Sequence, residues 1–131
     1  MKNNTIIEGG DIMGFLTVIE VSKKQSYIFK SNRLRENIGA SEIIAFITQE
    51  LPQELCNKYN GKHISSGGGS SIFYFENKDD SKNFSNAYSK SILKKFPSLE
   101  FFLASLEYDS EKDIIIDKIK ALYEKLGKKK A

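Results

Sequence analysis

The sequence has little of what builds disulfide frameworks, membrane spans or secretion signals. Its 131 residues include a single cysteine, Cys56, which excludes an internal disulfide and favours a reducing cytoplasm. The one histidine, His63, lies in another predicted element, so we expect Cys56 to be a packing residue rather than a nucleophile. No apolar run approaches the roughly 18 residues of a membrane span, and the polar N-terminus lacks the apolar core of a signal peptide. We therefore expect a cytoplasmic protein without a membrane segment.

The chain also has little charge imbalance. It carries 20 basic and 17 acidic residues, a net charge of +3, which is too small to indicate nucleic-acid binding by itself. Its length is that of one domain. We expect residues 1–13 to be a disordered lead-in, residues 14–127 to form the domain, and residues 128–131 to be a solvated basic tail.

Apolar patterns alternate between short β-rich runs and helical stripes. Strands are predicted over 14–21, 62–66, 71–77 and 99–108, and helices over 39–59, 77–96 and 110–127. The stripe of the first helix consists of Ile43, Ile44, Ile47, Leu51 and Leu55. Pro52 should kink or restart that helix, because proline removes a backbone donor.

The helix ends carry capping signals. Ser41 is a natural N-cap for the first helix, and Asp80 or Ser81 for the second. Ser110 and Asp113 form a capping box for the third helix, which should stop at Gly127.

The predicted order is β-α-β-β-α-β followed by a C-terminal helix. This is the α+β, ferredoxin-like arrangement, a four-stranded antiparallel sheet with two helices on one face. The first strand then lies beside the third, which brings Glu20 close to the turn at Gly67–Ser70. The first amides of the helix capped by Ser41 should point the same way and favour an anion.

The glycine triplet allows three explanations. It could be a plain hairpin turn, a loop that lets a phosphate approach the backbone, or a catalytic turn that has lost its acids. No Walker or Rossmann pattern accompanies it. Spacing alone favours the plain turn, with Ser41 as a simple cap and Glu20 as a strand-end carboxylate facing water.

Three separated stretches resemble one protein family: EVSKKQSYIF (20–29), NIGASEII (37–44) and SSGGGSSIFYFEN (65–77). They look like the palm domains of the large signature subunit of type III CRISPR effector complexes. That subunit has two palms related to nucleotide cyclases and polymerases. One palm has a Gly-Gly-Asp-Asp turn and makes cyclic oligoadenylate from ATP; the other, N-terminal palm has a degenerate turn and helps to hold the nucleotides. The chain resembles the second kind over about residues 15–108.

The resemblance implies a nucleotide site with ATP as ligand. In such palms the first strand often leads into Asp-Ile-Ser-Gly-Ile-Gln; here Glu20 takes the acidic place and Lys23 replaces the glycine. The positions that match the family, and are implied to lie at the nucleotide, are Ser22, Gln25, Gly39, Ala40, Ser41, Gly67 and Gly68. Gly69 and Ser70 stand where the active palm has its two aspartates, and the resemblance implies that they too lie at the nucleotide.

The missing aspartates decide which kind of palm this is. Nucleotidyl transfer by palms needs two metal ions held by carboxylates. A glycine and a serine cannot replace two aspartates as Mg²⁺ ligands, which leaves Glu20 as the one candidate ligand. Asp79 and Asp80 cannot substitute for the missing acids, because they begin the next helix at the far end of the third strand. The triplet is therefore interpreted as the phosphate-approach turn of a palm that is not active alone.

Such a palm implies partners. These are a second, competent palm (in a C-terminal part of the same protein, on another chain or in a homodimer) and other CRISPR effector subunits with guide RNA, acting in antiviral signalling through cyclic oligoadenylate. One alternative is a stand-alone minimal palm nucleotidyltransferase acting as a homodimer. Another is a ferredoxin-like RNA-binding or regulatory module, with Phe73, Phe75, Phe101 and Tyr108 as aromatics on the sheet.

Overall fold

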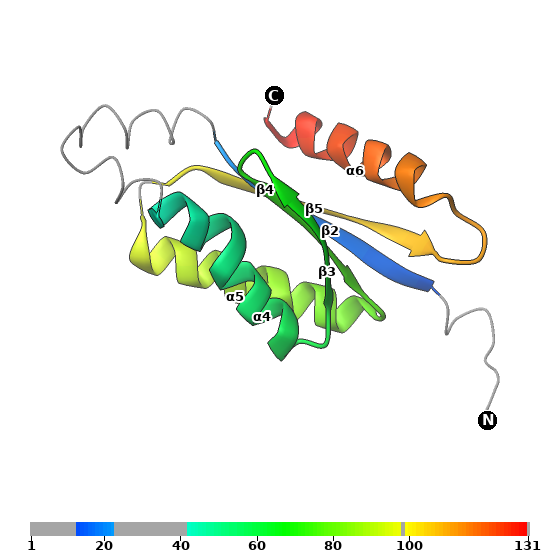
Figure 1. The fold of residues 1–131 in the computed structure, drawn as a ribbon, viewed down its shortest axis with the longest axis horizontal. Helices are drawn as coiled ribbons and strands as arrows, with labels where there is room; N and C mark the ends of the chain where they lie inside the picture. The colour runs from blue at the N-terminus through cyan, green and yellow to red at the C-terminus, as the bar shows by residue number, and fades with distance from the viewer. Residues whose placement is uncertain (1–12, 23–41, 98, 131) are drawn as a thin grey trace.

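The computed structural model describes residues 13–22, 42–97 and 99–130, and within them one antiparallel sheet. Its strands are β2 (Met13–Val21), β3 (Lys62–Gly67), β4 (Ser70–Phe75) and β5 (Phe101–Asp109), in the order β3-β4-β2-β5. The helical elements are the π turn η2 (Phe46–Glu50), α4 (Leu51–Lys58), α5 (Lys78–Lys95) and α6 (Ile115–Lys130) (Figure 1). The predicted α+β fold, a four-stranded antiparallel sheet with a C-terminal helix, is confirmed.

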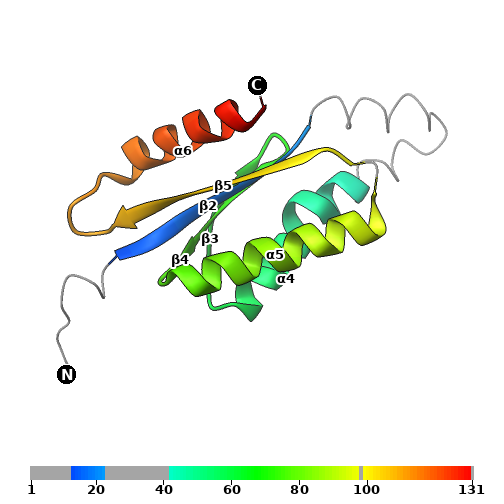
Figure 2. The same ribbon diagram turned by 180° about the vertical axis from the view of Figure 1, so that it is seen from behind.

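The sheet has helices on both faces, and the alternation of side chains along β2 explains why. Ile19 and Val21 belong to a core with η2, α4 and α5, whereas Leu16 and Val18 belong to a second core with α6. Figures 1 and 2 show α4 and α5 on one side of the sheet and α6 on the other. Both faces of β2 are therefore apolar and buried.

The helix that leads into α4 changes its winding before Pro52. The backbone is α-helical at residues 42–45, forms η2, and resumes as an α-helix at Leu51 with Pro52 in the first turn, so the predicted restart is confirmed. The Leu51 N–H bonds to the Phe46 carbonyl, five residues back. Because this wider turn rotates the helix face, the prediction that Ile43 lies on the buried stripe is wrong; it is 36% exposed.

The winding change leaves two carbonyl groups without their usual helical donors. Since the Leu51 N–H goes to the π bond, the Ile47 carbonyl accepts instead from the Tyr88 hydroxyl of α5, at 2.8 Å. Pro52 has no N–H, and the Thr48 carbonyl accepts from the Ser71 hydroxyl of β4. Side chains from two other elements thus satisfy the buried backbone and hold η2 against the sheet.

The N-cap of α5 is Asn77, so the prediction of Asp80 or Ser81 is wrong. The Asp80 N–H donates to the Asn77 side-chain oxygen at 2.8 Å. Ser81 lies one turn further and is buried, where its hydroxyl bonds to that of Thr17 at 3.0 Å. The cap lies earlier than predicted because Asn77, in an extended conformation, already supplies the capping oxygen.

The capping box predicted before α6 is wrong, because Asp113 bonds to Asp109 and not to Ser110. Asp113 accepts from the Asp109 N–H at 2.8 Å, and Asp109 accepts in turn from the Glu111 N–H at 2.9 Å. These two bonds shape the turn after β5 without Ser110, and α6 itself begins only at Ile115.

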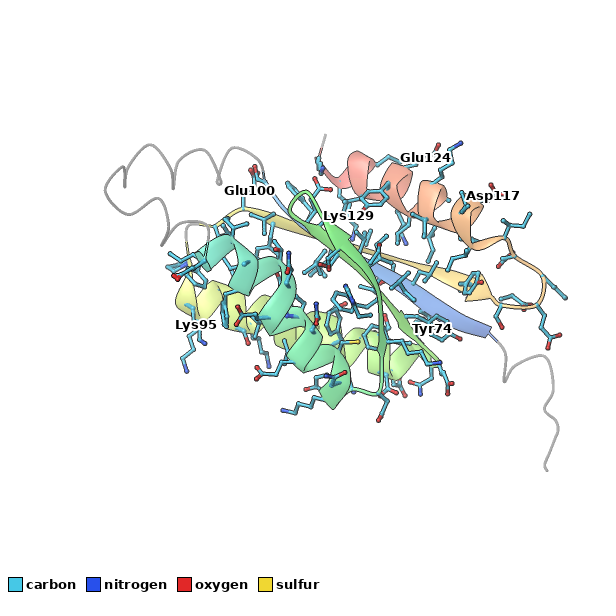
Figure 3. All side chains as sticks on the ribbon, in the orientation of Figure 1. Tyr74, Lys95, Glu100, Asp117, Glu124 and Lys129 are labelled. Carbon is cyan, nitrogen blue, oxygen red and sulfur yellow. The ribbon has the colours of Figure 1, made fainter. Side chains whose placement is uncertain are left out.

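The prediction that the last helix stops at Gly127 is also wrong, because α6 continues to Lys130. Residues 128–130 of the predicted basic tail are helical and contact the sheet. Lys129, labelled in Figure 3, donates to the Leu103 carbonyl at 2.6 Å. Lys130 forms an ion pair with Glu20. Docking on the sheet favours the helical state over a solvated tail. Among the described residues, no helix is both long and apolar enough to cross a membrane.

Candidate functional site

The register of β2 and β4 brings Glu20 to the glycine turn. Glu20 lies opposite Ser70, the first residue after the turn. The Val21 N–H donates to the Gly69 carbonyl at 3.0 Å, which extends the pairing into the turn itself. The structure therefore brings together the acidic strand end and the turn, as the predicted strand order required.

Hairpin geometry by itself explains two of the three glycines. Gly68 and Gly69 have φ angles of +60° and +84° and form the two-residue connection between the paired Gly67 and Ser70. Positive φ at both central positions is typical of a type I′ turn, which side chains other than glycine, asparagine and aspartate adopt poorly.

Gly67 is not explained by the turn. Its φ is not positive, and a Cβ atom added to it would meet nothing within 4 Å. A Cβ at Gly68 would also meet open space. The outer side of the turn is thus open to solvent, and a ligand could approach the backbone there without displacing a side chain.

The Glu20 carboxylate is largely covered and faces an ammonium group. Its side chain is 14% exposed and forms an ion pair with Lys130 at the end of α6. The Lys130 ammonium also lies over the Phe102 ring, 5.9 Å from its centre. Within the described ranges no group of three or more histidine, cysteine, aspartate or glutamate side chains could hold a metal ion. One carboxylate that is already paired does not fit a two-metal centre.

Ser70 is also occupied by α6. It is nearly buried, and its hydroxyl bonds to the Tyr123 hydroxyl at 2.7 Å. Glu20 and Ser70 therefore lie on the sheet face that α6 covers. A ligand at the turn would contact the open backbone at Gly67 and Gly68 before it reached either side chain.

The other predicted residues are divided between the described part of the chain and the rest. Ser22 is half-buried, and its N–H donates to the Glu100 carbonyl at 3.0 Å, which continues the β2–β5 pairing. The predicted positions Gln25, Gly39, Ala40 and Ser41 lie outside the described residues.

A chain of hydroxyl groups beside the turn was not predicted. His63 Nε2 lies 2.6 Å from the Ser66 hydroxyl, which lies 2.7 Å from that of Ser71, and Ser71 donates to the Thr48 carbonyl. A register shift between His63 and Ser65 makes the spacing irregular, so strand alternation could not reveal it. This series of hydrogen bonds ends at the Thr48 backbone carbonyl, so it connects the hairpin to η2. It lacks the acidic residue that orients the histidine in a catalytic triad.

Comparison with known proteins identifies the fold. No family model and no curated protein matches the sequence. A chain of the Csm1–Csm4 cassette in complex with cA4 is similar over 93% of this chain, with a TM-score of 0.66 and 16% identity. The same cassette in complex with AMPPNP matches over 89%, with a TM-score of 0.63 and 16% identity. A bacterial light-regulated adenylyl cyclase matches over 74%, with a TM-score of 0.58 and 8% identity.

The chain is much shorter than these structures. It spans 54% of the adenylyl cyclase chain but only 18% and 19% of the two Csm1–Csm4 chains. At such identities the likeness concerns the fold. The chain has the palm fold that the adenylyl cyclase and the Csm1–Csm4 cassette share, and the resemblance found in the sequence is confirmed at the level of the fold.

Proposed function

We propose that the chain is a nucleotide-binding, catalytically incomplete palm of a type III CRISPR-like antiviral signalling protein. The observation that carries this proposal is the open glycine turn beside a single carboxylate, Glu20. The resemblance found in the sequence aligns this turn with the acids of a competent palm. The Csm1–Csm4 cassettes with the same fold were solved in complex with AMPPNP and with pppApApA, which supports ATP as the ligand class.

The turn would bind phosphate through its backbone. A Cβ atom added to Gly67 or Gly68 would meet nothing within 4 Å, so no side chain blocks an anion that approaches the backbone there. Ser22, at the end of β2, would add a polar group beside them. The remaining contacts are proposed for Gln25 and for the stretch 39–41, which lies outside the described residues.

The chain would need a partner palm for catalysis. Glu20 is its one candidate acid at the turn, and Lys130 already neutralises it. Two metal ions cannot be held by that carboxylate alone, so this chain would position a nucleotide while the competent palm supplies the metal centre for cyclic oligoadenylate synthesis. We also propose other CRISPR effector subunits and guide RNA as partners of this chain.

The test is ATP binding and turnover by the purified chain. We expect weak ATP binding by calorimetry and no cyclic or linear oligoadenylate from labelled ATP with Mg²⁺ or Mn²⁺. Gly67→Val should reduce ATP binding at least roughly fivefold, because a side chain would occupy the open approach at no backbone cost. The matched control, Ser65→Val, changes an exposed residue of the same strand and should bind ATP normally.

Two results would overturn the proposal. Oligoadenylate made by this chain alone and abolished by Glu20→Ala would favour the stand-alone homodimeric enzyme. Equal ATP affinity of the Gly67→Val variant and the original chain would remove the turn from the site. RNA binding across the sheet aromatics is not favoured, because Phe73 and Phe75 are fully buried under helices.

A further inference from the structure

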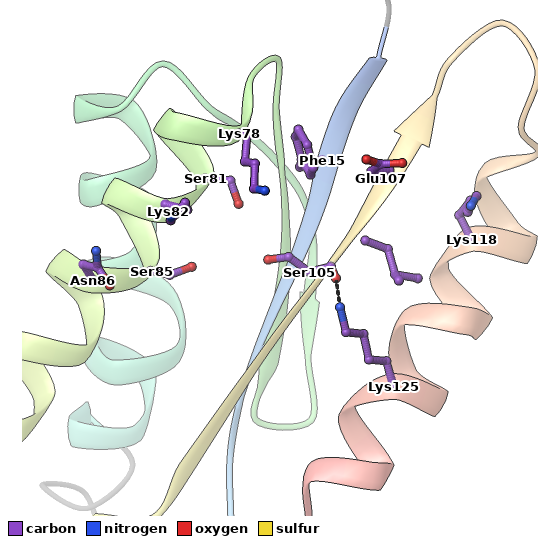
Figure 4. A pocket seen from close by; sticks show the side chains of 11 residues that line it. Phe15, Lys78, Ser81, Lys82, Ser85, Asn86, Ser105, Glu107, Lys118 and Lys125 are labelled. Carbon is purple, nitrogen blue, oxygen red and sulfur yellow. Dashed lines mark hydrogen bonds between the residues drawn. The ribbon is translucent and has the colours of Figure 1, made fainter.

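A concave site lies at the edge of the sheet, away from the glycine turn. It is a cleft of about 560 Å³ that straddles β5 between α5 and α6 (Figure 4). Its lining residues are Phe15, Lys78, Ser81, Lys82, Ser85, Asn86, Ser105, Leu106, Glu107, Lys118 and Lys125. Phe15 pairs with Phe75 near the start of β2, whereas Glu20 lies five residues further along that strand. The cleft and the turn are therefore at opposite ends of the sheet.

One polar stripe of α5 forms a wall of the cleft. Residues 78, 81, 82, 85 and 86 follow the spacing of a single helix face. That stripe lies beside the buried one, which includes Phe84 and Tyr88. Because α5 packs its apolar stripe on β2 and β4, its polar stripe is left facing β5 across an open space.

The floor of the cleft is held by hydrogen bonds. The fully buried Thr17 hydroxyl lies 3.0 Å from that of Ser81 and 2.8 Å from that of Ser105. These bonds connect α5, β2 and β5 directly beneath the cleft. The cleft is thus part of the packed fold and its shape is set before any ligand arrives.

The lining is rich in donors and positive charge. Lys78, Lys82, Lys118 and Lys125 face a single acidic residue, Glu107. Lys118 lies 3.9 Å from Asp113, and Lys125 donates to the Ser105 carbonyl at 2.6 Å. Lys78 and Lys82 form neither an ion pair nor a hydrogen bond within the described part of the chain. The Ser85 hydroxyl and the Asn86 amide add neutral donors, so the site favours an anion with several oxygens.

An extended peptide is a poorer occupant than a phosphate chain. Strand addition to β5 would need its outward backbone groups. Lys129 and Lys125 already bind the outward carbonyls of Leu103 and Ser105, which is how lysines protect an edge strand.

We propose that this cleft binds the linked phosphates of a nucleotide or of a short single-stranded oligonucleotide. Lys78 and Lys82 contact the phosphates, and Lys118 and Lys125 add positive potential from the other side. Phe15, which lines the cleft, offers a ring against which a base can pack, and Glu107 accepts hydrogen bonds from sugar hydroxyl or base amino groups. The site is separate from the turn, so neither proposal depends on the other.

The test measures the affinities of labelled oligouridylate, ATP and tripolyphosphate for the original chain and for two matched double variants. Lys78→Gln/Lys82→Gln should weaken binding to the cleft about tenfold. It should also reduce the slope of log binding constant against log salt concentration by about 0.7 for each lysine that contacts a phosphate. The control, Lys90→Gln/Lys94→Gln, removes the same charge from exposed positions of the same helix, away from the cleft. It should weaken binding less than about twofold.

The probe whose binding is weakened by Lys78→Gln/Lys82→Gln shows which kind of molecule supplies the phosphates. Loss of oligouridylate binding alone indicates a nucleic-acid strand, and loss confined to ATP and tripolyphosphate indicates a free nucleotide. Equal losses in the two double variants, or no binding of any probe at low salt, would overturn the proposal. The fold-loss caused by Lys78→Gln/Lys82→Gln should be the same in the original chain and in a chain that also carries Gly67→Val, because the two sites do not share residues. This comparison separates failure at the cleft from failure of the site at the turn.

Discussion

The Tyr88 hydroxyl does at the π turn what a backbone N–H does elsewhere in a helix. It is fully buried and donates to the Ile47 carbonyl, whose usual donor is engaged in the π bond. Burial raises the pKa of this phenol, so it remains protonated and keeps donating over the whole physiological range.

Tyr88→Phe should therefore destabilise the protein. The change leaves the Ile47 carbonyl buried without a donor, which costs about 1–3 kcal/mol. Urea unfolding followed by circular dichroism measures the loss. Tyr59→Phe is the control, because the Tyr59 side chain is half-buried and its hydroxyl has no hydrogen bond in the described part. Equal losses in both variants would show that the bond contributes nothing.

Cys56 is expected to be unreactive in the folded protein. The side chain is buried, and burial raises the pKa of its thiol from 9.0 to about 11. Iodoacetamide at neutral pH should therefore alkylate the folded chain much more slowly than the urea-unfolded chain, since the thiolate is the nucleophile.

The same shift gives a pH dependence of stability. The folded state favours the neutral thiol, so this contribution is complete below about pH 9 and is lost as the pH rises toward about 11. The difference in unfolding free energy between the original chain and Cys56→Ala should shrink across that window. A constant difference, or equal alkylation rates in the folded and unfolded chains, would contradict the burial of Cys56.

At the scale of the hairpin, the glycines of the turn have different reasons to be glycine. Gly68 adopts a positive φ, while Gly67 does not, and both face open space. Conformation therefore constrains one position, and neither packing nor conformation constrains the other. A glycine that the fold does not need is the local signal that favours a ligand at the turn.

This difference predicts opposite outcomes for two alanine variants. Gly68→Ala should cost about 1–2 kcal/mol because an L side chain is strained in the left-handed region. Gly67→Ala should be neutral or slightly stabilising, since it lowers the entropy of the unfolded chain. Thermal unfolding of the two variants tests this. Equal destabilisation would mean that Gly67 has a structural role in the hairpin.

At the scale of the whole molecule, β2 joins two cores. One face of the strand packs under η2, α4 and α5, and the other under α6. Loss of either helical layer would expose apolar side chains of the central strand. The two layers should therefore unfold together, and a change in the α6 core should lower the stability of the entire described domain.

Leu126→Ala tests that coupling. Leu126 is 1% exposed in the core beneath α6, so its truncation should cost about 2–5 kcal/mol in a single unfolding transition. Ile116→Ala, on the same helix but 68% exposed, should change stability by less than about 0.5 kcal/mol. A normal stability of Leu126→Ala, or two separate transitions, would show that α6 is not docked as part of one cooperative unit.

The sequence by itself determined the elements, their order and the neighbourhood of the turn. Period-two and helical apolar patterns are local and strong, so strands and helices were placed to within a few residues of their observed ends. The βαββαβ order then required Glu20 to lie beside the glycines, as the pairing with Ser70 shows. At the wider helix turn the sequence predicted only a break at Pro52. The π turn is stable because Tyr88 and Ser71, which are distant in the sequence, donate hydrogen bonds to the Ile47 and Thr48 carbonyls, and a local pattern does not reveal such donors.

Only the tertiary structure decided what surrounds those residues. Lys130 and Tyr123 of α6 occupy Glu20 and Ser70, although the sequence suggested a solvated tail and an open site. The cleft likewise lies between α5, β5 and α6. Its four lysines come from α5 and α6, are far apart in the sequence and produce no motif. Local periodicity specifies which side of an element is apolar. Which distant polar groups meet depends on how the layers pack, because those contacts form only when residues such as Glu20 and Lys130, 110 positions apart, are brought together.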